Sequence, residues 1–143
     1  MELGTLGSIL KYAQELENAL ITYSKGVISN SKEPKTVEIF QDFIKKHEKI
    51  LKRLKRVRHE NTTEMILEPI KDFNSNDYLL VEPDQQVYSE EKFVQTMKDI
   101  ETVIRDFYFI AAKKVNFITE VSSFLEKLAE KHQENIELFN PTL

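Results

Sequence analysis

The sequence has no cysteine and no tryptophan, and its 143 residues include only 3 glycines and 4 prolines. Without cysteine the chain cannot form disulfides, thiolate metal sites or iron–sulfur clusters. Few glycines and prolines, together with 31% charged residues, favour helix over sheet or disorder. No apolar run approaches the roughly 18 residues of a membrane span, and the first residues lack the pattern of a signal peptide. We therefore expect a soluble, cytoplasmic, helical domain.

Four segments of the chain carry apolar residues at steps of three and four, the spacing of the buried face of an amphipathic helix. Pro34 is well placed to open the second of them, and Ser89 followed by two glutamates is typical of an N-cap and first helical turn. Asn116 marks a turn between the third and fourth segments, and Asn140-Pro141 stops the fourth. We expect helices at about residues 3–29, 34–59, 90–115 and 117–139.

A long segment, at about residues 60–88, joins the two halves of the chain. Short connections within each half make two antiparallel hairpins, at about residues 3–59 and 89–139, whereas the long segment can cross the bundle from end to end. One long crossover gives the up-down-down-up order of ferritin-like bundles. We therefore expect residues 1–143 to form one all-α, ferritin-like four-helix bundle, with a short crossover helix between Thr63 and Ile70.

Four ionisable residues occupy inward positions of these helices, one in each helix: Glu17, His47, Glu101 and His132. They repeat along the chain, since 30 residues separate the first Glu from its His and 31 separate the second pair. A buried charge without a partner is costly, so four such groups in one core need one another, a metal or water. We call these residues the quartet and expect them to meet at similar depth.

Two interpretations of the quartet are open. Two carboxylates and two imidazoles form a four-ligand set for one divalent metal, with zinc, iron and manganese as candidates. Alternatively, two buried Glu–His pairs satisfy each other by charge-assisted hydrogen bonds without any metal. Tyr23 and Tyr108 follow the two glutamates by about two helical turns. Two roles are open for them: hydrogen bonds to metal ligands, or core packing with the hydroxyl at the rim, which is the more common role of such a tyrosine.

The motifs around the quartet resemble those of a known family. Ala13–Glu17 followed by Tyr23, and Ile100-Glu101 followed by Tyr108, are similar to the first-helix motif of rubrerythrin-like proteins of the ferritin superfamily. In that motif a metal-binding Glu precedes a Tyr. Leu128–Asn135 looks like the family's second-helix motif, which has Leu-Ala followed by Glu-x-x-His. The resemblance covers nearly the whole chain and implies a metal site within a ferritin-like bundle.

The chain departs from this family in the second helix of each hairpin. Family members have a Glu and a His three residues apart there, and the glutamates bridge two metals. Here His47 and His132 stand in the Glu positions, and Ile50 and Asn135 stand in the His positions. A shift of one residue brings Glu48 into place but leaves His47 without a role. The resemblance then implies at most one divalent metal with weak oxidase or peroxide chemistry, or else a metal-free interaction or scaffold module.

Residues 45–58 are strongly basic, with 8 Lys or Arg residues and 1 Glu. Such a segment indicates either a phosphate-binding patch or a solvated helix face. The second interpretation is favoured because no aromatic residues interleave with the basic ones and the net charge of −4 does not suggest nucleic acid or an anionic membrane as a partner. Glutamates of the fourth helix are available to neutralise the segment: Glu126, Glu130, Glu134 and Glu137.

The phenylalanines of the chain bear on whether it forms oligomers. The chain has 9 phenylalanines, and three of them, Phe107, Phe109 and Phe117, lie off the main apolar seam. Exposed aromatic side chains are enriched at protein interfaces. A homodimer is therefore plausible, while the sequence identifies no other protein partner.

Overall fold

Four long helices make up most of the structure, a computed structural model that describes residues 1–61, 70–80 and 89–139. They are α1 (Leu6–Asn30), α2 (Pro34–Glu60), α3 (Glu90–Lys114) and α4 (Thr119–Phe139), and a short 3-10 helix, η2 (Ser75–Tyr78), lies in the crossover. Within these residues there is no strand, and no helix is long and apolar enough to cross a membrane. The four expected helices are confirmed. The helix stop at Asn140-Pro141 and the expected crossover helix lie outside the described residues, except for Ile70, which is not helical.

Local hydrogen bonds fix where α1 and α3 begin. Thr5 and Ser8 form a capping box, in which each side chain accepts from the other's backbone N–H at 3.1 Å. The first helix therefore does not start near Leu3 as predicted. Instead, the backbone N–H of Leu3 donates to the carbonyl of Phe73 at 2.8 Å, so the chain ahead of α1 pairs with the crossover. At α3, Ser89 caps the first turn as predicted.

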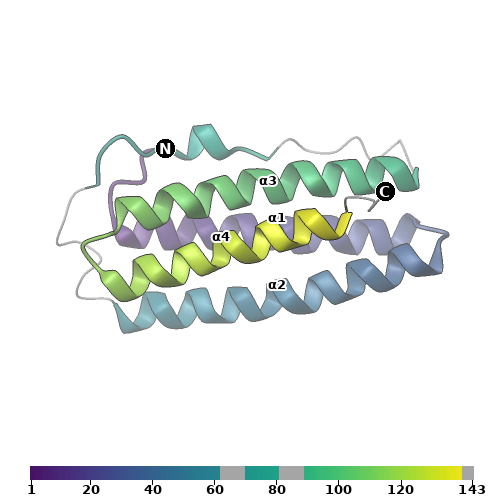
Figure 1. The fold of residues 1–143 in the computed structure, drawn as a ribbon, viewed down its shortest axis with the longest axis horizontal. Coiled ribbons are helices and arrows are strands. Elements are labelled where there is room, and N and C mark those ends of the chain that lie inside the picture. Colours follow the sequence, from purple (N-terminus) through teal and green to yellow (C-terminus); the bar gives the residue numbers. More distant parts are fainter. Residues whose placement is uncertain (62–69, 81–88, 140–143) are drawn as a thin grey trace.

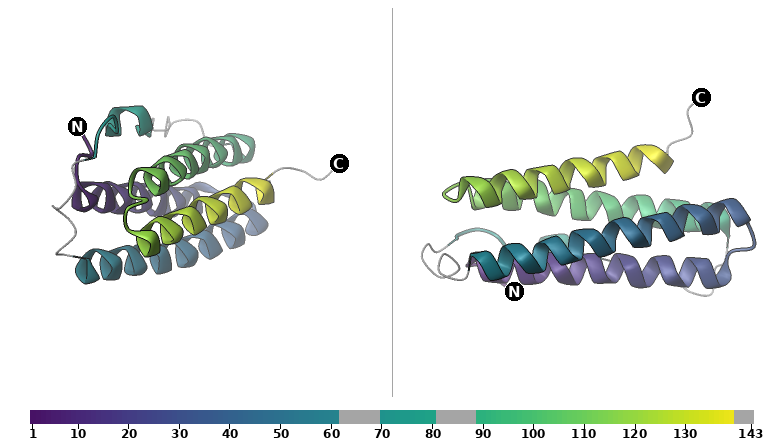
Figure 2. Two further views of the ribbon diagram at one scale, coloured as in Figure 1. Left: turned by 60° about the vertical axis from the view of Figure 1, so that its left-hand side comes forward. Right: turned by 90° about the horizontal axis from the view of Figure 1, so that it is seen from below.

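The crossover carries the chain from one end of the bundle to the other. It lies beside the start of α1, where the backbone N–H of Ile70 donates to the carbonyl of Gly4 at 2.8 Å. The first turns of α3 lie beside the late turns of α1, where the Tyr23 hydroxyl donates to the Phe93 carbonyl at 3.4 Å. Consequently α1 and α4 run in one direction and α2 and α3 in the other (Figure 1). Figure 2 shows the hairpins α1–α2 and α3–α4 packed side by side.

An apolar core runs along the bundle between the two hairpins. At one end the crossover covers it: Phe107 is 0% exposed and stacks on Phe73 with ring centroids 5.5 Å apart. Phe107 is therefore not a surface residue, and the expectation of an exposed aromatic group off the main seam holds only for Phe109 and Phe117, at 49% and 40% exposed. The core thus includes the crossover as well as the four helices.

Replacing Phe107 by Ala should lower the free energy of unfolding by about 3–5 kcal/mol, because it removes a buried ring and leaves a cavity. Phe109→Ala on the same helix is the matched control and should change stability by less than about 1 kcal/mol, since this side chain is half exposed. Urea denaturation of the two variants measures both values. Equal losses would mean that the crossover does not close the core over Phe107.

Candidate metal centre

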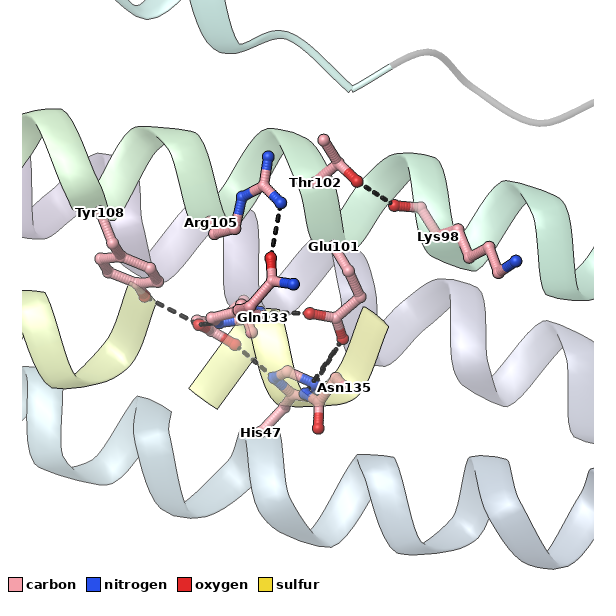
Figure 3. Close-up of polar contacts among 10 residues, drawn as sticks. His47, Lys98, Glu101, Thr102, Arg105, Tyr108, Gln133 and Asn135 are labelled. Carbon is pink, nitrogen blue, oxygen red and sulfur yellow. Dashed lines mark hydrogen bonds and ion pairs between the residues drawn. The ribbon is translucent and has the colours of Figure 1, made fainter. Parts of the chain in front are cut away.

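The quartet meets at mid-length of the bundle, with one residue from each of the four helices. All four side chains are 0% exposed. Three of them lie between buried apolar neighbours on their helices, and His132 lies between Leu128 and Asn135, so the same amphipathic pattern that builds the core also carries the charges into it. Figure 3 shows Glu101 reaching from α3 towards His47 on α2. The predicted convergence of the four groups is confirmed.

The quartet forms a closed ring of alternating carboxylates and imidazoles. His47 places Nδ1 at 2.7 Å from Glu17 Oε2 and Nε2 at 3.2 Å from Glu101 Oε1. His132 places Nε2 at 2.9 Å from Glu17 Oε1, and its Nδ1 contacts Glu101 Oε2. Every ring nitrogen therefore faces one carboxylate oxygen, and every carboxylate oxygen faces one ring nitrogen.

The ring has an approximate two-fold symmetry that matches the repeat in the sequence. Each histidine uses Nδ1 for the glutamate of its own hairpin and Nε2 for the glutamate of the other hairpin. The two imidazole rings face each other with centroids 5.1 Å apart. The near-equal steps of 30 and 31 residues thus correspond to two hairpins that each bring one Glu–His pair to a shared centre.

The proton count and the pKa directions together set the charges in this ring. Four nitrogen–oxygen contacts need four protons, so the ring is neutral overall; because the pKa values of Glu17 and Glu101 are lowered, the carboxylates are ionised and both nitrogens of each histidine carry a proton to donate. His47 and His132 are then imidazolium cations, paired with two carboxylate anions, and the ring is neutral. Four full charges are buried here without a net charge, which is the condition under which such burial is tolerated.

The pKa values follow from the same pairing. Burial acts to raise the pKa of Glu17, but the charges of His132 and His47 outweigh it and lower that pKa; the pKa of Glu101 is lowered in the same way. Burial acts to lower the pKa of His132, but Glu101 and Glu17 raise it to about 10, and the pKa of His47 is also raised. Around neutral pH, all four groups are therefore charged.

Two further side chains donate to the carboxylates from outside the ring. The Tyr108 hydroxyl donates to Glu17 Oε1 at 2.8 Å, and Asn135 Nδ2 donates to Glu101 Oε1 at 3.3 Å. Burial and the neighbouring Glu17 carboxylate raise the pKa of Tyr108 well above its usual value, so it remains a donor. Each carboxylate thus accepts three hydrogen bonds, and both outer donors come from the α3–α4 hairpin (Figure 3).

Of the two roles open for the tyrosines, Tyr23 does not take that of a donor to the quartet. Its hydroxyl donates to the carbonyl of Phe93 rather than to a member of the quartet. Tyr108 follows Glu101 by seven residues, and the residue seven positions after Glu17 is Ser24, which is 0% exposed and whose hydroxyl has no hydrogen-bond partner. The symmetric counterpart of Tyr108 is therefore a short side chain that cannot serve as an outer donor.

The alternative register for α2 is excluded by burial. Glu48, which that register would place in the core, is exposed, while Ile50 is buried one turn from His47. No second carboxylate from α2 or α4 reaches the centre among the described residues. The donor set therefore consists of two carboxylates and two imidazoles, without the bridging glutamates of a two-metal site.

Donor atoms of three quartet residues are close enough to share one ion. Glu17, His47 and His132 each offer an atom within 4.8 Å of the others. Glu101 is not part of this group, although it contacts both histidines. A tetrahedral ion with bonds of about 2.0–2.1 Å needs donors roughly 3.3 Å apart. The contacts of 2.7 and 3.2 Å use different nitrogens of His47, so one ion could bind only one nitrogen of each histidine, and the contact of the other nitrogen would remain a hydrogen bond.

In metal-free protein the free energy of unfolding should fall as the pH rises from about 6.5 to 10. The pKa of His132 is about 10 in the folded chain and near 6.5 when unfolded, so the stabilisation is complete below pH 6.5 and is lost as the histidine deprotonates in the fold. Urea denaturation with a chelator at pH 6.5 and 9.5 measures the difference. His59→Gln, at an exposed position, is the control that should keep it. A flat profile would exclude the doubly protonated ring.

Tyr108→Phe should cost about 1.5–3 kcal/mol in the free energy of unfolding, because it removes one of the two charge-assisted hydrogen bonds that Glu17 Oε1 accepts in the core. Tyr23→Phe removes the same atom from a long hydrogen bond to a neutral carbonyl and should cost less than about 1 kcal/mol. The two variants are compared under identical denaturation conditions. A larger loss for Tyr23→Phe would contradict the assignment of Tyr108 as the outer donor.

Comparisons with known proteins identify no family for this chain. No protein-family model matches it, and no match was found among curated proteins or solved structures. The resemblance to rubrerythrin-like proteins therefore rests on the motif residues alone, and the site has to be interpreted from its own chemistry.

Proposed function

We propose that this protein is a ferritin-like four-helix bundle that binds one divalent metal ion, iron, manganese or zinc, through the quartet. The observation that carries the proposal is the closed, fully buried ring of two carboxylates and two imidazoles. Carboxylate oxygens and imidazole nitrogens are common protein ligands of all three metals. The helix directions and the long crossover support the ferritin-like assignment.

Charge balance favours a divalent ion in this ring. A nitrogen must lose its proton to bind a metal, so each histidine gives up one proton and keeps the other for a hydrogen bond. Two carboxylates with two imidazolium cations are neutral, and so are two carboxylates with two neutral imidazoles and one divalent cation. The core can thus exchange two protons for one metal ion without changing its net charge, which avoids a new desolvation cost.

The requirement for a neutral core also limits the site to one metal ion. A second divalent ion would leave two positive charges in a core that has no further carboxylate among the described residues. Dinuclear sites hold their metals about 3.5–4 Å apart and share ligands between them, and the ligands needed for sharing are missing here. The resemblance to rubrerythrin-like proteins therefore extends to the position of the site and not to its metal count.

The arrangement supports metal binding more strongly than turnover. Four protein ligands fill a tetrahedral ion, and structural sites are closed in this way, whereas catalytic sites keep one position open. Oxidase or peroxide chemistry at an iron or manganese ion in this ring would be weak for that reason. The sequence also has no cysteine that could hold an electron-transfer cluster.

A metal-free interaction or scaffold module is the second candidate. One observation favours it: the ring already satisfies all of its carboxylate and imidazole groups without metal. In this interpretation the quartet fixes how the two hairpins pair, as buried polar groups do in some helical assemblies. Function would then reside on the surface of the bundle.

Metal analysis separates the two candidates. Apo protein reconstituted with Fe²⁺, Mn²⁺, Zn²⁺ or the spectroscopic probe Co²⁺ and then desalted should retain about one equivalent of one of these metals. Bound Co²⁺ should show the intense visible absorption of a four-coordinate ion. His47→Gln with His132→Gln should abolish retention, whereas His59→Gln, an exposed histidine, should leave it unchanged.

Two outcomes would contradict the metal site. Retention below about a tenth of an equivalent for every metal would support the metal-free module. Retention that His59→Gln removes, and the double variant preserves, would place the metal elsewhere. Circular dichroism of the double variant checks that it folds. If it does not, Glu101→Gln keeps the shape of the ligand and removes its charge, and it should weaken Co²⁺ binding at least tenfold.

A further inference from the structure

The basic segment, residues 45–58 of α2, concentrates positive charge on the surface of an acidic protein. It carries 8 Lys or Arg residues against 1 Glu, in a chain whose net charge is −4. All eight side chains are exposed: Lys45, Lys46, Lys49, Lys52, Arg53, Lys55, Arg56 and Arg58. Fourteen helical residues extend for about 20 Å, so the charges form a continuous strip.

Acidic neighbours do not neutralise this strip. Of its eight basic residues, only Lys46 forms an ion pair within the described part of the chain, at 3.2 Å from Asp42. The glutamates of α4, expected to pair with it, make no ion pair with the basic segment. Glu126 and Glu130 instead line a groove of about 390 Å³ together with Phe109 of α3, on the other flank of α4.

The flank of α4 that faces α2 carries lysines. The guanidinium of Arg53 lies over the ring of Phe124, 5.0 Å from its centroid, which identifies the side of α4 that meets α2. Lys127 and Lys131 follow Phe124 by three and seven residues, and these spacings place them on the same helical face. Both lysines are exposed, and the exposed Glu120 and Glu134 share this face with them by the same spacing. Basic residues therefore extend from α2 across the seam to α4, and we call this combined surface the basic face.

The composition of the basic face selects the kind of partner. The exposed residues of the basic segment are all charged, whereas protein interfaces depend on buried aromatic or aliphatic anchors. A helix that lies on a membrane needs an apolar side to insert, and the apolar side of α2 is packed in the core. A polyanion needs neither, because its binding is driven by release of counterions.

We propose that the basic face binds the phosphate backbone of nucleic acid without reading its sequence. Double-stranded DNA carries one charge per about 1.7 Å, so a length of about 20 Å offers roughly a dozen phosphates to the strip. No aromatic side chain of the basic segment is available for stacking on bases. This binding surface is separate from the quartet, and the two assignments stand or fall independently.

Fluorescence anisotropy with a labelled 20-base-pair duplex tests the proposal on the full chain. Binding should be measurable at 50 mM salt and fall about a thousandfold by 200 mM, as expected for about six neutralised phosphates. Lys127→Gln with Lys131→Gln should weaken binding and reduce the slope of log K against log salt by about 2. Lys11→Gln with Lys25→Gln removes two exposed lysines from α1 and should leave the slope unchanged.

Three results would overturn the proposal. Absence of binding at 50 mM salt is the first, and binding that does not depend on salt is the second. The third is an equal loss in the α1 and α4 variants, which would mean that the charge acts globally and not through the basic face. Vesicles with one third phosphatidylserine serve as the second probe: binding to them and not to the duplex would assign the face to a membrane surface instead.

Discussion

The ring of Glu17, His47, Glu101 and His132 is the constraint on which the arrangement of the helices depends. Four full charges are removed from water. They stabilise one another, and the two carboxylates also accept hydrogen bonds from the outer donors Tyr108 and Asn135. Removing one partner from such a buried set typically costs about 3–5 kcal/mol, because an uncompensated charge remains. Since the four groups come from four helices, any shift of one hairpin along the other by a turn would break two of the contacts. The ring therefore fixes the register of the bundle.

The surroundings of the ring are less symmetric than the ring itself. At equivalent positions, α3 carries Met97 and Tyr108 where α1 carries Ala13 and Ser24, and all four are fully buried. The larger side chains of α3 occupy more of the shared core and supply the donor to Glu17. On α1 the short Ser24 leaves a buried hydroxyl unpaired, a defect that costs about 1–3 kcal/mol. Two similar hairpins have thus acquired different roles, with the second holding the carboxylates in place.

Spacing along the sequence predicts the helices and the meeting of the quartet. It does not predict which neighbouring side chains contact the quartet, because that depends on small differences in their angle around the helix axis. Tyr108 stands seven residues after Glu101 and returns to the same helical face, whereas Tyr23 stands six after Glu17 and lies about 120° away from it. On α2, steps of three and four from His47 lead to Ile44 and Leu51, which are only half-buried, and to Phe43 and Ile50, which are buried. Which nitrogen meets which carboxylate could not be predicted, because it depends on how the hairpins dock.

The rotation of about 100° per residue along an α-helix also explains why the net charge of a segment does not predict the charge of each surface that it forms. Glu126-Lys127 and Glu130-Lys131 are neighbours in sequence, so the segment appears neutral. On the helix, however, the glutamates lie towards α3 and the lysines towards α2. Glu126 and Glu130 therefore lie on one flank of α4, whereas Lys127 and Lys131 lie beside the strip on α2, together with Glu120 and Glu134. Neighbours in sequence thus separate on the surface, while the charges in the core, which come from four distant segments, meet in a neutral ring.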